Sequence, residues 1–229
     1  MNSYMKEEIL EQANLISSKA EYWSKRAIAL RDLIKSKKNI VLLGRGTSGN
    51  ACVFASYLFG LTTGRHPIDF RPWLATQDTP QSDWSDCVVL AYTQSGESTD
   101  IVLATKWLKE RGASVIAITN ATNAQISIAK VSDEIFFLEA GVENAVPATK
   151  TYTAQLIATV ALTGINIIPH IEQITNSLRS YLDNNISDLM VDFLINKSVT
   201  MWLARGLVQP AALDAALKMQ ETVNSAAFG

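Results

Sequence analysis

Residues 38–49 read KNIVLLGRGTSG, in which an apolar run of strand length, Ile40–Leu43, ends in glycines, and residues 50–59 continue with helical spacing. The same order of strand, polar turn and helix recurs between residues 87 and 110. Strands that alternate with helices predict an α/β fold, a doubly wound parallel sheet flanked by helices, with ligands beyond the carboxyl ends of its strands. Further strand candidates lie at Pro67–Phe70, Ser114–Thr119 and Glu134–Leu138.

A helical segment precedes this α/β unit, which we place at residues 37–180. Residues 5–34 set apolar side chains at steps of three and four, the spacing of an amphipathic helix. Residues 1–36 are therefore predicted to form one or two N-terminal helices.

The end of the chain resembles the start of the α/β unit. Lys197–Gly206 repeats the apolar run and the Arg-Gly turn of Lys38–Gly46. Unless this echo arises by chance, residues 181–229 begin a second unit that stays incomplete at Gly229, with a helix from Ala211 to about Val223. A half-formed unit leaves apolar surface uncovered, so we expect a homo-oligomer, most simply a dimer, to cover it.

Composition and charge narrow the class of partner. The 229 residues carry 20 Lys and Arg against 22 Asp and Glu, a formal net charge of −2, and 48% of them are hydrophobic. Such a chain has no overall excess of positive charge to attract a polyanion. Neither nucleic acid nor a membrane is therefore an expected partner. Cys52 and Cys87 are too few for a disulfide framework, and the sequence shows no export signal. We expect a cytoplasmic protein with a small-molecule partner.

Two polar turns that follow strands are candidates for ligand binding. Gly44–Gly49 fits the G-x-G-x-x-G pattern, and Asp69 stands near the distance expected of an acidic group on a ribose hydroxyl, so a nicotinamide dinucleotide is one possible ligand. However, Thr47 and Ser48 in this turn and the hydroxyl-rich Thr93–Thr99 in the other favour phosphate. Short donors there stand beside the free N–H groups of helix N-termini. Either turn alone would also suit ordinary helix capping.

Three separate motifs occur in a fixed order along residues 38–168. They are Thr47-Ser48 after the glycine turn, Thr93-Gln94-Ser95-Gly96-Glu97-Ser98, and Val146-Pro147-Ala148-Thr149-Lys150-Thr151. Together they resemble the sugar isomerase (SIS) domain family, in particular its tandem-domain branch, which includes glucosamine-6-phosphate synthase and the isomerase-type glucosamine-6-phosphate deaminases. The resemblance implies a flavodoxin-like three-layer sandwich, with residues 37–180 as the SIS domain and a truncated second SIS unit after it.

In this family, hydroxyl groups of the first two motifs hold a sugar phosphate. The resemblance therefore implies phosphate ligands at Ser48, Thr93, Gln94, Ser95 and Ser98, with Thr47 beside them, and sugar contacts at Gly46 and the backbone of Val146. Pro147 replaces the usual alanine, which removes one backbone donor. The resemblance implies no metal and no other cofactor.

The helix expected near the end of the chain carries Lys218 and Glu221, three residues apart on one face. The resemblance implies that Glu221 moves a proton between C1 and C2 of an open-chain sugar, with Lys218 beside it, whereas a solvated surface pair is the competing interpretation. The activity implied is that of an aldose–ketose isomerase or deaminase acting on a hexosamine 6-phosphate such as glucosamine 6-phosphate. Neither His66 nor His170 matches the family's ring-opening histidine, so a binding module without catalysis is the alternative.

Overall fold

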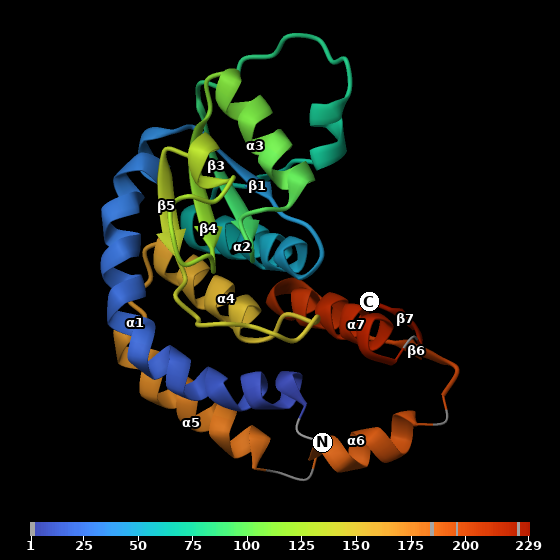
Figure 1. The fold of residues 1–229 in the computed structure, drawn as a ribbon. Helices are drawn as coiled ribbons and strands as arrows, with labels where there is room; N and C mark the ends of the chain where they lie inside the picture. The colour runs from blue at the N-terminus through green and yellow to red at the C-terminus, as the bar shows by residue number, and fades with distance from the viewer. Residues whose placement is uncertain (1–2, 184–185, 196, 224) are drawn as a thin grey trace.

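A parallel sheet forms the centre of the computed structural model, which describes residues 3–183, 186–195, 197–223 and 225–229. The sheet has five strands in the order β2-β1-β3-β4-β5, and each neighbouring pair is parallel (Figure 1). The doubly wound sheet predicted from the sequence is confirmed. The strands are β1 (Asn39–Leu43), β2 (Ile68–Asp69), β3 (Cys87–Thr93), β4 (Ser114–Thr119) and β5 (Glu134–Phe137).

Helices cover both faces of the sheet. One face packs against α1 (Tyr4–Ser36), α2 (Thr47–Thr63) and α4 (Lys150–Leu162), and the other against α3 (Thr99–Glu110). A 3-10 turn, η1 (Pro72–Thr76), lies beside α3. These are the three layers that the sequence led us to expect.

Alternation along the strands explains the two cores, because successive strand residues point to opposite faces of a sheet. Ile40 and Leu42 of β1 join the core under α1, α2 and α4, whereas Val41 and Leu43 join the core under α3. All residues of β3 are buried, as expected for a strand inside a sheet covered on both sides.

The N-terminal segment is a single helix where the sequence allowed one or two. α1 is continuous over 33 residues and packs against α4 and against α5 (Ile171–Leu182). Trp23 of α1 is fully buried and donates its indole N–H to the backbone oxygen of Leu138 at 2.8 Å. This bond ties the middle of α1 to the chain just beyond β5.

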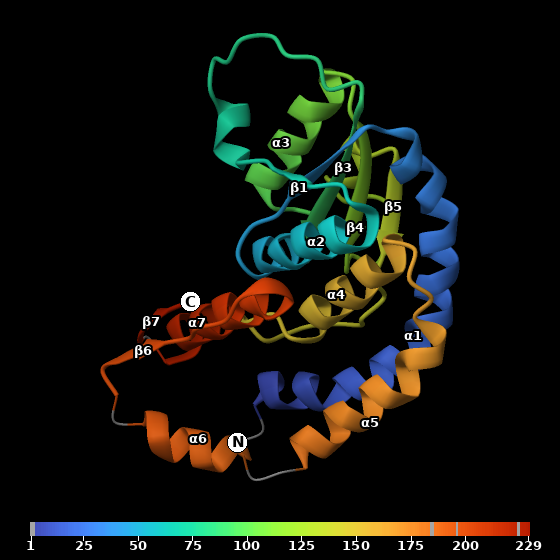
Figure 2. The ribbon, with the colours of Figure 1, turned by 180° about the vertical axis from the view of Figure 1, so that it is seen from behind.

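The C-terminal segment after α5 extends away from the three layers, and its helix α7 (Gln209–Val223) packs back against them. It also contains α6 (Ile186–Leu194), β6 (Val199–Met201) and β7 (Ala226–Phe228), and β6 pairs with β7 in a small parallel sheet. α7 packs against α2, so it lies beside the carboxyl ends of the strands (Figure 2). The short turns that complete the chain are η2 (Ala129–Val131), η3 (Ile168–His170) and η4 (Gly206–Val208).

The strand and helix expected around Lys197–Gly206 and from Ala211 are present as β6 and α7, and the sequence did not indicate β7. That residues 181–229 begin a second SIS unit stays a prediction.

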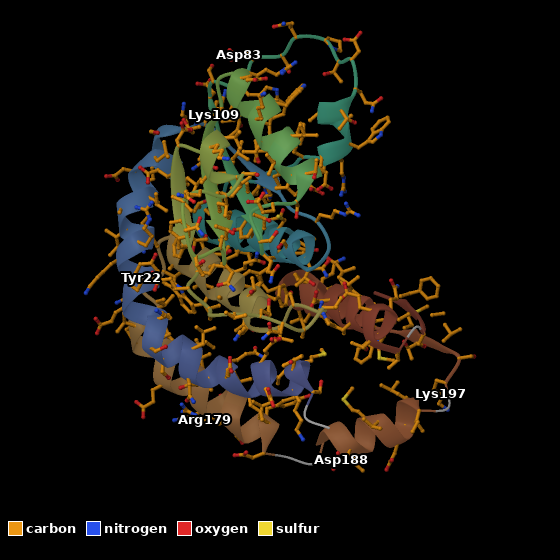
Figure 3. The ribbon with its side chains drawn as sticks, in the orientation of Figure 1. Tyr22, Asp83, Lys109, Arg179, Asp188 and Lys197 are labelled. Carbon is orange, nitrogen blue, oxygen red and sulfur yellow. The ribbon has the colours of Figure 1, made fainter. Side chains whose placement is uncertain are left out.

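Asp83, in the loop before β3, and Asp188, on α6, lie at opposite ends of the molecule (Figure 3). Within the described residues, no helix is both long enough and apolar enough to span a bilayer.

Candidate functional site

The first turn of the site joins β1 to α2. Gly46 has a left-handed φ of 57°, which suits glycine, and α2 begins at the next residue. At Gly44 a Cβ atom would lie 2.6 Å from the backbone oxygen of Ser48, so only glycine fits this close approach. The turn thus places Thr47 and Ser48 at the N-terminus of α2, where free N–H groups favour an anion.

Ser48 is held by a residue that the sequence analysis missed. Its side chain is buried, and its Oγ accepts a hydrogen bond from Nε2 of Gln155 at 2.9 Å. Gln155 is fully buried on α4, and a polar amide within the apolar stretch of that helix was the signal that could have drawn attention to it. The bond fixes the orientation of the serine hydroxyl.

The second turn joins β3 to α3. Thr93 Oγ1 accepts the N–H of Gly96, and Ser95 Oγ accepts the N–H of Glu97, both at 3.2 Å. The Glu97 carboxylate in turn accepts the N–H of Ser127 at 3.0 Å and its hydroxyl at 2.5 Å. These hydrogen bonds from Ser127 hold the pKa of the Glu97 carboxyl below its usual range. The turn is therefore braced against the loop that follows β4.

Both turns open into one pocket of about 200 Å³. The structure brings together eight of the residues predicted for the site, while Gly46 borders a neighbouring cleft of about 1040 Å³. A 200 Å³ pocket lies below the roughly 300–1,000 Å³ of common ligand sites. The lining residues of the smaller pocket are Arg45, Thr47, Ser48, Tyr92, Thr93, Gln94, Ser95, Ser98, Ile101, Val146, Ala148 and Glu221.

α7 brings Lys218 and Glu221 to the first turn. Lys218 Nζ donates to Thr47 Oγ1 at 2.6 Å and lies 3.2 Å from Glu221 Oε2 and 3.6 Å from Asp214 Oδ1. The exposed fraction is 15% for the Lys218 side chain and 30% for that of Glu221. Lys218 therefore points toward α2 and not into open solvent.

Asp214, which the sequence analysis did not single out, anchors this arrangement. It is buried and accepts a hydrogen bond from Asn50 Nδ2 of α2 at 3.1 Å. Burial raises the pKa of the nearby Tyr152 hydroxyl, and the negative charge of Asp214 raises it further. The Asp214 carboxylate thus joins α7 to α2 and lies close enough to α4 to affect the phenol of Tyr152.

The loop that carries Val146 is held from both ends. Glu143 Oε1 accepts the N–H groups of Thr149 at 2.9 Å and Thr151 at 3.1 Å, which satisfies donors at the start of α4. Glu8 of α1 accepts the N–H groups of Asn144 at 2.5 Å and Ala145 at 3.2 Å.

α1 makes a second attachment beside this loop, where Lys150 Nζ pairs with Glu11 at 2.5 Å. Lys150 is itself buried at the start of α4. The first turns of α1 therefore brace the third motif of the site, and nothing in the local sequence of α1 indicated this role.

The remaining candidates lie apart from the pocket. Asp69, the acidic residue of the dinucleotide alternative, borders the larger cleft and pairs with Arg71 at 2.9 Å. His66 lies near Gly60, toward the end of α2 far from Thr47, and His170 directly precedes α5. Across the described part of the chain, no group of three or more His, Cys, Asp or Glu side chains is arranged to hold a metal ion.

Comparison with known proteins gives one family match. The sequence profile described as the SIS domain matches residues 33–164. Among curated proteins, the glutamine–fructose-6-phosphate aminotransferase (isomerizing) of Pyrococcus horikoshii is 29% identical over 236 residues, which cover 95% of this chain and 38% of that protein. The chain thus spans less than half the length of this relative.

Solved structures show the same architecture. A phosphosugar-isomerase-like protein from Silicibacter pomeroyi superposes with a TM-score of 0.86 at 25% identity, covering 99% of this chain and 71% of the other. The C-terminal domain of glucosamine-fructose-6-phosphate aminotransferase from Francisella tularensis gives a TM-score of 0.77 at 26% identity, covering 100% of this chain and 69% of the other.

Proposed function

The chain belongs to the SIS domain family, and on this basis we propose that it binds a hexosamine 6-phosphate such as glucosamine 6-phosphate and acts on it as an aldose–ketose isomerase or a deaminase. The observation that carries the proposal is the convergence of two hydroxyl-rich turns and Glu221 on one pocket. The name of the Pyrococcus horikoshii relative, which refers to fructose 6-phosphate and to isomerization, supports the same class of substrate.

The two turns would hold the phosphate. Ser48 stands in the first turn of α2 and Ser98 directly precedes α3, so the positive ends of two helix dipoles face the same pocket. Thr93, Gln94 and Ser95 add side-chain donors from the second turn. Neutral donors and helix ends of this kind bind a phosphoryl group without requiring a bound cation.

Glu221 would act as the base on the open-chain sugar. In the isomerase reaction its carboxylate removes the proton from C2 and returns it to C1, while a second proton moves from the amino nitrogen on C2 to the oxygen on C1, which leaves a 2-imino ketose. In the deaminase reaction the same shift at the amino-bearing carbon is followed by water addition and loss of ammonia, which leaves fructose 6-phosphate. Lys218, 3.2 Å from Glu221, would orient the carboxylate and stabilise negative charge that develops on the sugar oxygens.

A sugar-phosphate-binding module without catalysis is the second candidate. Two features favour it: the pocket measures only about 200 Å³, and the Glu221 carboxylate is paired with Lys218 and partly open to solvent. Such a protein would retain the phosphate sites and release the sugar unchanged.

Time-resolved NMR of glucosamine 6-phosphate with the purified protein separates these candidates. New signals of fructose 6-phosphate together with an equal amount of ammonia support the deaminase, because the nitrogen on C2 must leave to give this product. Exchange of the C2 proton with deuterated solvent, without release of ammonia, supports the isomerase. The Glu221→Gln variant is expected to lose turnover and keep phosphate binding, whereas Glu110→Gln, on the exposed part of α3, serves as a charge-matched control. Line broadening without conversion supports the binding module, and unchanged turnover in Glu221→Gln removes the role of that residue.

We further propose that the protein works in the cytoplasm as a homodimer with a small phosphosugar, and not with nucleic acid or a membrane. Both cysteines are buried and unpaired, as is usual in a reducing compartment.

Apolar side chains on α6 and β6 are exposed, among them Leu189 at 70% and Met201 at 67%. A second copy would remove this surface from water. Light scattering in solution tests the dimer, and a monomeric mass contradicts it.

A further inference from the structure

A second hollow, with a volume of about 560 Å³, lies at the far end of α2 and α4 from the candidate site. Both helices start at the candidate site, and they run side by side toward α1 (Figure 2). Because α2 has 17 residues, the two sites are separated by about 25 Å. The hollow is lined by Arg31, Ile34, Lys35, Lys37, Lys38, Phe59, Thr62, Thr63, Arg65, Leu162 and Thr163.

The lining of this hollow is strongly cationic. It contains Arg31, Lys35, Lys37, Lys38 and Arg65, and no carboxylate. None of these cations forms a salt bridge with a residue that the structure describes. Because the whole chain carries a net charge of −2, this density of positive charge is local.

Neutralisation of helix ends does not account for all of this charge. The C-terminal turns of α1, α2 and α4 border the hollow, and each contributes about half a negative charge. Together they offset about 1.5 of the five positive charges. A surplus of about 3.5 positive charges remains for an occupant.

The two arginines are held in fixed positions. Arg31 donates from Nε and Nη2 to the backbone oxygen of Ala161 at 3.3 and 2.9 Å. Arg65 donates from Nη1 to the oxygen of Ile34 at 3.0 Å and from Nη2 to that of Lys37 at 2.6 Å. Each guanidinium has five N–H groups, so each retains free donors while its geometry is already set.

Lysines and hydroxyl groups complete the lining. The side-chain ammonium groups of Lys35 and Lys38 have no hydrogen bond or ion pair to any of the described residues. Thr62 and Thr163 donate their hydroxyl protons back to the oxygens of Leu58 and Val160, both at 2.7 Å, which leaves their own oxygen atoms available as acceptors. Fixed guanidiniums, free ammonium groups and outward acceptors suit a ligand that carries both anionic and hydroxyl groups.

We propose that this hollow is a second anion site, which takes a small metabolite bearing at least two phosphate or carboxylate groups. Its volume falls within the range of about 300–1,000 Å³ that small-molecule sites usually occupy. The proposal stands apart from the proposed function, because it uses none of the residues of the candidate site.

A titration monitored by ¹⁵N NMR tests this site, with pyrophosphate and citrate as separate probes at constant ionic strength. Binding is expected to shift the backbone amides of residues 31–38, 62–65 and 163. Tighter binding of pyrophosphate identifies a phosphorylated ligand, and tighter binding of citrate identifies a polycarboxylate. Binding of either probe at the candidate site shifts a different set of amides, those of residues 47–49 and 93–99.

Charge-reversal variants provide the control. Lys35→Glu/Lys38→Glu is expected to weaken binding at the hollow at least about tenfold, because it removes the two unpaired cations. Lys6→Glu/Lys25→Glu changes the net charge equally, at exposed positions on α1 away from the hollow, and is expected to change the affinity of the hollow less than about twofold. Equal losses in the two variants, or no shifts at residues 31–38 in the unaltered protein, overturn the proposal.

Discussion

Single atoms decide whether the first turn of the site can form. A Cβ atom on Gly44 would lie 2.6 Å from the Ser48 oxygen and 2.8 Å from the Cys52 sulfur, whereas one on Gly49 would meet its nearest neighbour, the Gly44 oxygen, at 3.5 Å. The two glycines stand five residues apart and look alike in the sequence. Gly44 has no room for a side chain because it faces the backbone of α2 at close range, whereas Gly49 has room for one.

This contrast gives a prediction for two alanine variants. Gly44→Ala is expected to lower the free energy of unfolding by about 1–3 kcal/mol, as overpacking does, and to weaken phosphate binding by displacing Ser48. Gly49→Ala is expected to be neutral or to stabilise by up to about 1 kcal/mol, because alanine favours helix. Chemical denaturation measures both, and equal losses would show that the close approach at Gly44 does not matter.

A second prediction at this scale concerns pH. The hydrogen bonds from Ser127 keep the pKa of Glu97 below its ordinary value of 4.5. The carboxylate therefore contributes stability that is present above pH 4.5 and is lost as the pH falls through the lower, folded value. The amide NMR signal of Ser127 is expected to titrate with a midpoint below 4.5. In Glu97→Gln this transition is expected to disappear, and a wild-type midpoint at or above 4.5 would contradict the assignment.

At the scale of elements, α1 does more than cover the sheet. Its Glu8 carboxylate binds two N–H groups of the loop that carries Val146, and its Glu11 pairs with Lys150 at the start of α4. The position of the loop therefore depends on a helix more than 130 residues away in the chain.

Two substitutions of Glu8 test this dependence. Glu8→Leu leaves the N–H groups of Asn144 and Ala145 without an acceptor, each at a cost of about 1–3 kcal/mol, and is expected to weaken binding of glucosamine 6-phosphate about tenfold. Glu8→Gln keeps an acceptor oxygen and is expected to restore most of the affinity. If both variants bind as the wild type does, α1 does not position the loop.

The same elements show how far the sequence could predict the structure. Apolar runs of strand length and helical spacing located all five strands of the sheet and the helices α1, α2 and α3 beside them, because those patterns reflect burial on a local scale. The polar turns were found because turn chemistry is also local. Gln155, Glu8 and Asp214 were missed because each acts on a partner between 107 and 164 residues away, and only the folded chain brings such pairs together.

At the scale of the whole molecule, α6 and β6 carry a group of exposed apolar side chains, among them Leu189 and Met201. If a second copy covers them, Leu189→Asp is expected to shift the assembly toward the monomer, because a buried and unpaired carboxylate opposes association. Leu61→Asp is a matched control, since Leu61 on α2 is 72% exposed and Leu189 is 70% exposed. Sedimentation velocity measures both variants, and an unchanged dimer in Leu189→Asp would place the interface elsewhere.

The buried indole of Trp23 also allows the packing of α1 to be followed by intrinsic tryptophan fluorescence. Its N–H is bonded to the backbone just ahead of the loop that α1 braces, whereas another tryptophan, Trp73, is 67% exposed. An indole shielded from water emits at shorter wavelength than an exposed one. Separation of the middle of α1 from the chain beyond β5 would expose Trp23 and would therefore appear as a red shift in fluorescence, without any added dye.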